Sequence, residues 1–474
     1  MYEEEAVGSE VMLDNEEAVS PDSTVYDEGA GGFEPVAATR WQFFWLCALI
    51  LSFCYELPVA RLTTMNRMNP RFFDIVFIIG MITIFPNLNR TGRTPRLFRI
   101  WAWIVAVFCV CAVVWFPFFP WYYGKYVIFF ALKYVEGLLC MYMVLRIPIT
   151  SRQKKILHYL VVVGGLVVAG YAVLEYLHGG VKPFISARTG EEVIPGEGQL
   201  WSTLGSSYFQ VSLVSIASSV MALALFQSAV LPWSKLLYLG LGIFLGWPAF
   251  FSGARSGVVG CLAAWMAFFI LARASSKAIA TAIITVAVAL IVLVSPKLFS
   301  IEYLAEKSVG IRRMREIKLE ERLHLSWYHF EVYKWQGWLI PFVGGGFYVV
   351  PVTESDGSLR FRVGYGIHNA YLFAIEQGGI AAFVLFIAFL YVCWKELSYA
   401  RHSTIAADVA FATGMQAFFF SMLLIAFSGL FWLNDATGNF CFQMLILIII
   451  AVRTSVEETA ESYYYEPDYA DDFM

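Results

Sequence analysis

Two arginines stand out as side chains that could stabilise a negatively charged group. Arg255 lies in a small-residue stretch, 252–257, between two apolar runs, and Arg322 lies in the stretch 320–327, which mixes charged and apolar residues. The arginine fork binds phosphate oxygens through paired hydrogen bonds and keeps its charge. The alternative for Arg255 is a side chain that extends from the membrane edge to water. For Arg322 the alternative is a surface helix with local ion pairs.

A histidine and a run of glycines could complete such a site. His368 and Asn369 directly precede an apolar run, and histidine titrates near neutral pH, as a general base requires. The alternative is a helix start, capped by Asn369, at which His368 bonds locally. The run Gly344 to Gly346 allows positive φ and close approach of the backbone to a ligand, or else it stops a helix.

Long apolar runs must position these segments. The chain is 59% hydrophobic and 15% charged, whereas soluble domains are about 45–50% apolar and about 25% charged. Runs of about 18 or more apolar residues predict membrane-spanning helices. All eight cysteines fall inside the runs, where they pack as small apolar residues. We expect twelve runs: 41–58, 72–88, 98–119, 124–145, 156–177, 206–229, 235–252, 256–272, 278–295, 369–394, 409–433 and 436–452.

The basic residues of the short loops predict an orientation with both termini in the cytoplasm. Arg90 to Arg99, Arg146 to Lys155, Arg273 and Lys277, Lys395 and Arg401, and Arg453 all fall on one side in this arrangement. Arg61, Arg67 and Arg71 are the exception. The loop 296–368 then lies on the opposite side of the membrane, where its segment 312–339 reads as an amphipathic helix on the membrane surface.

Acidic tails flank the predicted transmembrane domain, 40–453. Residues 1–39 contain eleven acidic side chains and read as a disordered tail, and residues 454–474 contain seven. The second tail also holds Tyr463, Tyr464, Tyr465 and Tyr469. It is similar to tyrosine-kinase substrates that accompany polysaccharide export, and a plain disordered tail is the alternative.

Taken together, the polar segments resemble those of the O-antigen ligase and polysaccharide polymerase family. The resemblance is tightest over about residues 200–390. The stretch 204–208 lacks the asparagine of the family's Gly-x-x-Asn segment. The matching pieces, in chain order, are the Arg-Ser-Gly turn at 255–257, Arg322 with Trp327, the glycine turn Pro341 to Gly346, and His368-Asn369-Ala370-Tyr371-Leu372 followed by Glu376-Gln377-Gly378.

This resemblance implies an all-α bundle of about twelve transmembrane helices with a partly helical periplasmic loop, in the inner membrane of a bacterium. It also implies glycosyl transfer from a polyprenyl pyrophosphate to a sugar hydroxyl, with inversion at the anomeric carbon and with no metal or cofactor. The acceptor is lipid A core for a ligase or another lipid-linked repeat for a polymerase. Carried onto this chain, the catalytic residues are His368, Arg255 and Arg322, and the substrate-binding residues are Asn369, Tyr371, Gly344 and Gly346.

Further partners and alternatives also follow from the sequence. Membrane lipids and the polysaccharide export machinery are expected partners, and no segment predicts binding to nucleic acid. A transporter or flippase of lipid-linked glycans suits twelve spans equally, but such proteins tend to carry charges in the middle of the membrane. The spans here carry few such charges, namely Lys133, Glu136 and Glu175, and the polar segments gather at one face instead. This distribution favours chemistry at that face over transport. A non-enzymatic assembly scaffold is a third interpretation.

No strong strand pattern appears anywhere in the chain. Glu354 and Asp356 are spaced as in a metal-binding DxD motif, but their Ser-Asp-Gly context favours a hairpin turn.

Overall fold

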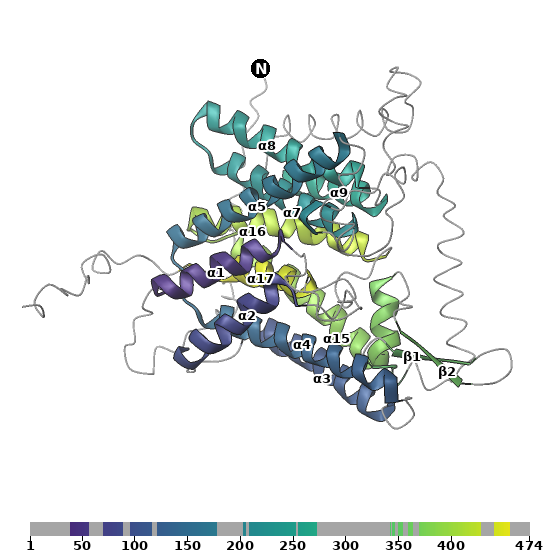
Figure 1. Ribbon diagram of the computed structural model, residues 1–474. Helices are drawn as coiled ribbons and strands as arrows, with labels where there is room; N and C mark the ends of the chain where they lie inside the picture. Colours follow the sequence, from purple (N-terminus) through teal and green to yellow (C-terminus); the bar gives the residue numbers. More distant parts are fainter. Residues whose placement is uncertain are drawn as a thin grey trace, which may run out of the picture. The chain divides into compact units, whose positions relative to one another are not determined.

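The computed structural model describes residues 38–55, 70–88, 95–115, 121–177, 202–204, 208–252, 255–272, 342, 344–346, 349–353, 359–363, 369–427 and 440–455, and Figure 1 draws all other residues in grey. The described residues belong to one unit, 37–474. Several predictions fall on residues outside these ranges: Arg322, His368, the apolar run 278–295, the amphipathic segment 312–339, and nearly all of both acidic tails.

Eleven of the twelve predicted runs contain a described helix. The helices are α1 (Arg40–Ser52), α2 (Phe72–Thr83), α3 (Arg96–Trp115), α4 (Trp121–Arg146), α5 (Ser151–Leu177), α7 (Tyr208–Ser228), α8 (Pro232–Phe251), α9 (Arg255–Leu271), α15 (Ala370–Ala400), α16 (Ala406–Ile425) and α17 (Phe440–Val452), with short 3-10 turns η2 (Phe85–Asn87) and η4 (Ser202–Leu204).

Seven of these described helices, namely α3, α4, α5, α7, α8, α15 and α16, are long and apolar enough to cross a membrane, as expected for a multi-pass membrane protein. Their lipid-compatible surface supports this. Val113, Leu132, Val167, Leu236 and Val384 of these helices are each more than half exposed. Soluble proteins rarely show such extensive apolar surface.

Three of the described helices contain fewer residues than a membrane crossing requires. Helices α1, α2 and α17 contain 13, 12 and 13 residues, which span about 18–20 Å, less than the hydrocarbon layer of about 30 Å. The limits of α2 have a clear cause, because Pro70 precedes it and Pro86 follows it, and proline interrupts helical hydrogen bonding.

The polar Gln443 near the start of α17 donates its amide to the Ser52 carbonyl at the end of α1 (2.9 Å).

Two contacts between helix ends show how α5, α15 and α16 are oriented. Lys154 and Asp408 pair at the starts of α5 and α16, so these two helices run parallel. The N–H of Ala370 donates to the carbonyl oxygen of Ala426 (2.8 Å), which joins the start of α15 to the end of α16. We call these two ends of the bundle the Lys154 end and the Asn369 end.

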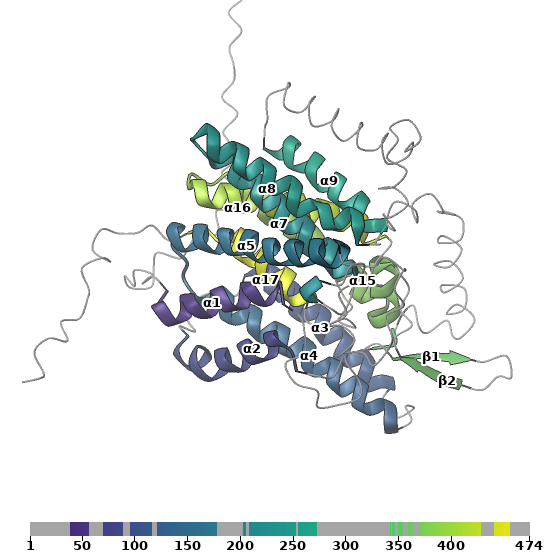
Figure 2. The same cartoon turned by 45° about the horizontal axis from the view of Figure 1, so that its top comes forward.

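Helix α7 packs between α5, α8, α9 and α16 in the upper half of the bundle as drawn in Figures 1 and 2. In the apolar stretch of α7, 89% of the residues are buried. Small residues allow the close packing. A Cβ at Gly165 of α5 would lie 2.2 Å from Cβ of Ser218, and one at Gly242 of α8 would lie 2.8 Å from Cδ2 of Leu223.

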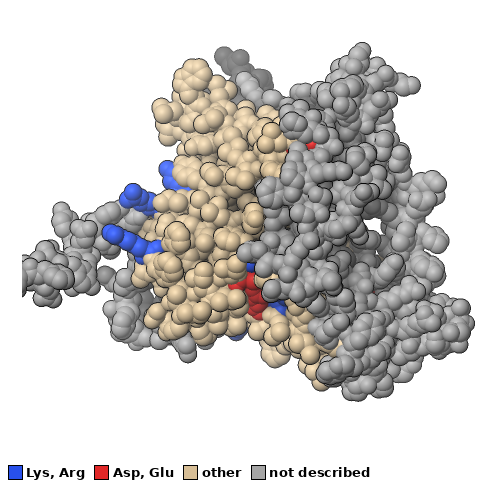
Figure 3. All heavy atoms as spheres, viewed as in Figure 1, with Lys and Arg blue, Asp and Glu red and all other residues tan. Residues whose placement is uncertain are grey.

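Basic side chains collect at the Lys154 end. Figure 3 shows them projecting from the left edge of the described surface, whereas most of the visible face is uncharged. The helix ends place these residues there: Arg40, Arg96, Arg99, Arg146, Arg152, Lys154, Lys155, Lys235, Lys395, Arg401 and Arg453.

A short hairpin departs from the all-α expectation. Strands β1 (Val349–Thr353) and β2 (Leu359–Val363) pair antiparallel, with Val349 opposite Val363 and Thr353 opposite Leu359. The strands flank Glu354 and Asp356, which the sequence predicts in a hairpin turn. Strand β2 alternates strictly between apolar and basic residues, a pattern from which this strand could have been predicted.

Candidate functional site at the broken helix

Helix α15 is broken near its start. Gly378 (φ −135°, ψ 17°) and Gly379 (φ 64°, ψ −167°) leave the helical conformation and divide α15 into a first segment, 370–377, and a second segment, 380–400. The conformation of Gly379 is essentially restricted to glycine. The glycine pair therefore sets the position of the break.

The two segments of α15 fold toward each other. The rings of Tyr371 and Phe386 lie 6.0 Å apart between centroids, whereas a straight helix would separate these residues by about 22 Å along its axis. The first segment starts beside Ala426, the residue that follows α16. It ends at α3, where a Cβ at Gly378 would lie 2.9 Å from the Phe108 ring. It therefore crosses the Asn369 end of the bundle.

The predicted glycine turn fills the break. The N–H groups of Gly345 and Gly346 donate to the carbonyl oxygens of Glu376 (2.6 Å) and Gln377 (2.8 Å), which the break removes from the helical hydrogen-bond ladder. Inside a membrane every backbone polar group needs such a partner. The loop segment thus satisfies the end of the first helical segment.

Gly344 and Gly346 approach protein backbone closely. Both have positive φ, 68° and 81°. A Cβ at Gly344 would lie 2.6 Å from the carbonyl oxygen of Gln377, and one at Gly346 would lie 2.6 Å from Cα of Ala112 in α3. The close backbone approach predicted for a ligand is therefore used, at these positions, for contact with α15 and α3.

Asn369 and Tyr371 hold the first segment in place. The side-chain oxygen of Asn369 accepts from the N–H groups of Tyr371 (3.0 Å) and Leu372 (3.1 Å), as in a helix N-cap. The Tyr371 hydroxyl donates to the carbonyl oxygen of Leu423 (3.0 Å) at the end of α16. Both side chains thus have structural partners.

Arg255 begins α9 at the same end of the bundle. The stretch before it is fixed by packing on α7, because Ser252 and Ser212 share a hydrogen bond of 2.5 Å between their hydroxyls. A Cβ at Gly260, in the second turn of α9, would meet the Ile425 side chain at the end of α16. Arg255 and Asn369 therefore open two helices that both contact the end of α16.

Sequence reasoning did not identify the buried polar residues at the break as site residues. Glu376 is 3% exposed and Gln377 is 2% exposed, and both directly precede Gly378. A carboxylate accepts hydrogen bonds, and an amide both accepts and donates them. The consecutive glycines after Glu376 are the signal from which the break could have been predicted.

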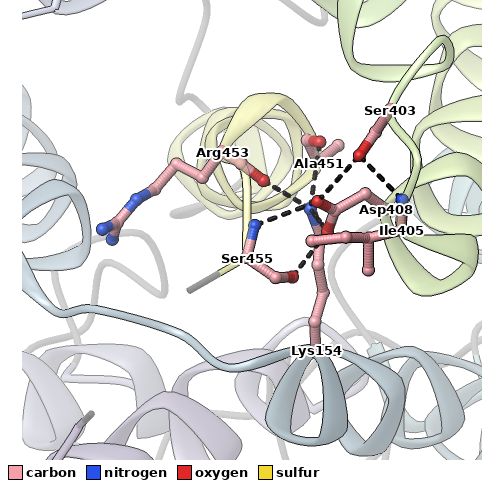
Figure 4. A network of polar contacts seen from close by, with 7 residues as sticks. All are labelled: Lys154, Ser403, Ile405, Asp408, Ala451, Arg453 and Ser455. Carbon is pink, nitrogen blue, oxygen red and sulfur yellow. Dashed lines mark hydrogen bonds and ion pairs between the residues drawn. The ribbon is translucent and has the colours of Figure 1, made fainter. Parts of the chain in front are cut away.

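The Lys154 end holds a different polar cluster (Figure 4). Lys154 Nζ lies 2.8 Å from Asp408 Oδ1, and both side chains are 1% exposed. The lysine also donates to the carbonyl oxygen of Arg453 (2.5 Å), and Asp408 accepts from the N–H (2.9 Å) and the hydroxyl (2.6 Å) of Ser455. Every charged group of this cluster is thus paired within the protein.

Metal-binding side chains do not gather in the part of the chain that the structure describes, where no three His, Cys, Asp or Glu residues come together.

No family model matches the chain, and no curated protein or solved structure is significantly similar to it.

Proposed function

We propose that the chain transfers a glycan from a polyprenyl pyrophosphate to a sugar hydroxyl, as an O-antigen ligase or polysaccharide polymerase does, at the Asn369 end of the bundle. One observation carries the proposal. The segments with the family-like motifs, namely the start of α9, the glycine turn and the start of α15, all meet at this end. These segments are far apart in the sequence.

The proposed orientation places the Asn369 end at the periplasmic face of the inner membrane of a bacterium. The basic residues of the Lys154 end support this orientation, because positively charged loops stay in the cytoplasm. Both termini are then cytoplasmic, and the proposed total of twelve spans includes the run 278–295. The large loop 296–368 is periplasmic in this arrangement.

In the proposed reaction, the oxygen of an acceptor hydroxyl attacks the anomeric carbon and the bond to pyrophosphate breaks. His368 accepts the hydroxyl proton, a role typically worth about 10²–10⁴ in rate. Arg255 and Arg322 stabilise the charge that develops on the leaving pyrophosphate. Removal of one such hydrogen-bond donor typically lowers the catalytic rate by about 10²–10³-fold. The broken segment of α15 supports this assignment, because it positions the backbone that follows His368.

A direct test uses purified protein, a polyprenyl-pyrophosphate oligosaccharide as donor, and two acceptors, lipid A core and the donor itself. A single shift of the core acceptor indicates a ligase, and a ladder of products indicates a polymerase. We expect His368→Ala to abolish either product. Full transfer by His368→Ala would overturn the proposed mechanism.

His402 provides a matched control. It is exposed at the Lys154 end, where its Nδ1 lies 2.7 Å from the carbonyl oxygen of Ser398. His402→Ala should therefore retain transfer. Loss of transfer in both variants would show that the assay reports protein integrity instead of catalysis.

A flippase for lipid-linked glycans is the second candidate function. The broken helix α15 favours it, since transporters bind substrates at discontinuous helices. Reconstitution in vesicles with a fluorescent lipid-linked glycan distinguishes the two functions. A flippase moves the intact lipid across the bilayer, whereas the proposed transferase separates glycan from lipid.

A further inference from the structure

A charged cluster outside the proposed site lies between α2 and α4. Lys133 Nζ contacts Asp74 Oδ1 at 2.5 Å and Glu136 Oε2 at 2.8 Å. Lys133 stands near the middle of α4, a helix of 26 residues. In Figure 3, acidic and basic side chains meet on the lower part of the described face, away from the basic side chains at its left edge. Ionisable groups at such a depth are costly and are typically functional.

The charges of this cluster do not balance. The three side chains are only 12–14% exposed, and two carboxylates share one ammonium group. If both carboxylates were ionised, the cluster would carry a net negative charge in a layer of low dielectric constant, which is strongly unfavourable. One added proton makes the cluster neutral.

The hydrogen bonds indicate which carboxyl group takes that proton. Asp74 Oδ2 accepts from the N–H of Arg71 (2.8 Å) and Asp74 Oδ1 accepts from Lys133, so both oxygens have donors that suit an ionised carboxylate. Glu136 Oε2 accepts from Lys133, but Glu136 Oε1 is enclosed and has no hydrogen-bond partner. An enclosed oxygen without a donor favours the protonated acid.

Two further groups in the described part of the chain, Cys140 and Arg71, lie near this cluster. Cys140 lies one turn further along α4, in the electrostatic range of Glu136. The charged groups that act on Glu136 are Lys133 and Asp74. Arg71, the buried residue that precedes α2, adds its N–H to Asp74.

We infer that Glu136, with Lys133 and Asp74, forms a proton-binding site within the membrane layer, separate from the proposed transfer site. When Glu136 holds the proton, Lys133 pairs with Asp74 and ties the first turn of α2 to the middle of α4. When Glu136 loses the proton, it competes with Asp74 for the lysine. Proton occupancy is thereby linked to the attachment of α2.

The test uses full-length protein in nanodiscs and a hydrophobic carbodiimide, which reacts with protonated carboxyl groups in apolar surroundings. Peptide mass spectrometry locates the adduct. We expect labelling of Glu136 at neutral pH and its loss as the pH rises. Asp408 is the internal control, because its carboxylate is ionically paired and accepts three further hydrogen bonds; it should stay unlabelled.

Three variants make the charge argument specific. Glu136→Gln should abolish labelling of the cluster. Asp74→Asn leaves one lysine for one carboxylate, so Glu136 should ionise and its labelling should be lost. Lys133→Met removes the cation, so Asp74 should be labelled in addition to Glu136. Persistent labelling of Glu136 in Asp74→Asn would contradict the shared-lysine account.

Infrared spectroscopy provides a second measurement that does not depend on access of the reagent. The wild-type protein should show the carbonyl band of a protonated carboxylic acid, and Glu136→Gln should lack it. Absence of that band in the wild type at neutral pH would overturn the inference. So would protection of Glu136 from the carbodiimide by Na⁺ at constant pH, because the site would then bind a cation.

Discussion

The two ends of the helix bundle use polar residues in opposite ways. At the Lys154 end, an ion pair 1% exposed is enclosed by Ser455 and by the carbonyl groups after α17. At the Asn369 end, α15 is broken, a glycine turn enters the break, and α9 and α15 begin beside the end of α16. The first end is a closed network that holds helices together, and the second positions the starts of helices.

The comparison separates residues that stabilise the fold from residues that are proposed to take part in the reaction. Lys154 and Asp408 neutralise each other at the Lys154 end, so loss of either side chain should lower stability whether or not the substrate binds there. At the Asn369 end, backbone hydrogen bonds and glycine conformations hold the framework, and Arg255, which is proposed to take part in the reaction, begins α9 there. Variants at each end test this division.

Breaking the ion pair should have the largest effect on stability. Lys154→Met leaves Asp408 charged and buried, which should lower the free energy of unfolding by about 3–5 kcal/mol. Thermal unfolding of the detergent-solubilised protein measures the change. The double variant Lys154→Met/Asp408→Leu should recover most of the loss. If the double variant is no more stable than Lys154→Met, the uncompensated charge is not the cause.

Changing the break in α15 should have an intermediate effect. Gly379→Ala forces an unfavourable conformation (φ 64°), at a cost of about 1–3 kcal/mol. Cysteines at positions 371 and 386 should be joined by a bifunctional thiol reagent in the parent protein, because the rings of Tyr371 and Phe386 are 6.0 Å apart. This cross-link should form less readily with Gly379→Ala.

Gly170 supplies the control for this substitution. It lies within α5, and a Cβ there would have no atom within 4 Å. Gly170→Ala should leave cross-linking unchanged and should raise stability slightly, by about 0.5–1 kcal/mol. A drop in cross-linking with Gly170→Ala would mean that the assay does not report the break.

Removing the cap of α15 should have the smallest effect on stability. Asn369→Ala loses two hydrogen bonds to the first turn and should destabilise the protein by about 1 kcal/mol. Thermal unfolding again measures it. Unchanged stability together with complete loss of glycosyl transfer would instead assign Asn369 to substrate binding, as the family resemblance implies.

The sequence predicted the parts of this fold that depend on local patterns. Apolar runs located the helices, and the capping role of Asn369 was one of two readings of its position. The fold-back of α15 was not predicted, because it depends on contacts of Gly378 and Gly379 with segments distant in the chain. The pairing of Lys154 with Asp408 has the same origin, since Lys154 alone reads as a topology signal.

The central claim is that the reaction takes place at the Asn369 end, and two arginine variants test it most directly. Arg255 begins α9 at this end, whereas Arg99 is exposed near the start of α3 at the Lys154 end. With a polyprenyl-pyrophosphate oligosaccharide as donor, Arg255→Ala should reduce the transfer rate by about 10²–10³, and Arg99→Ala should leave it unchanged. Equal rates for Arg255→Ala and the wild-type protein would contradict the claim.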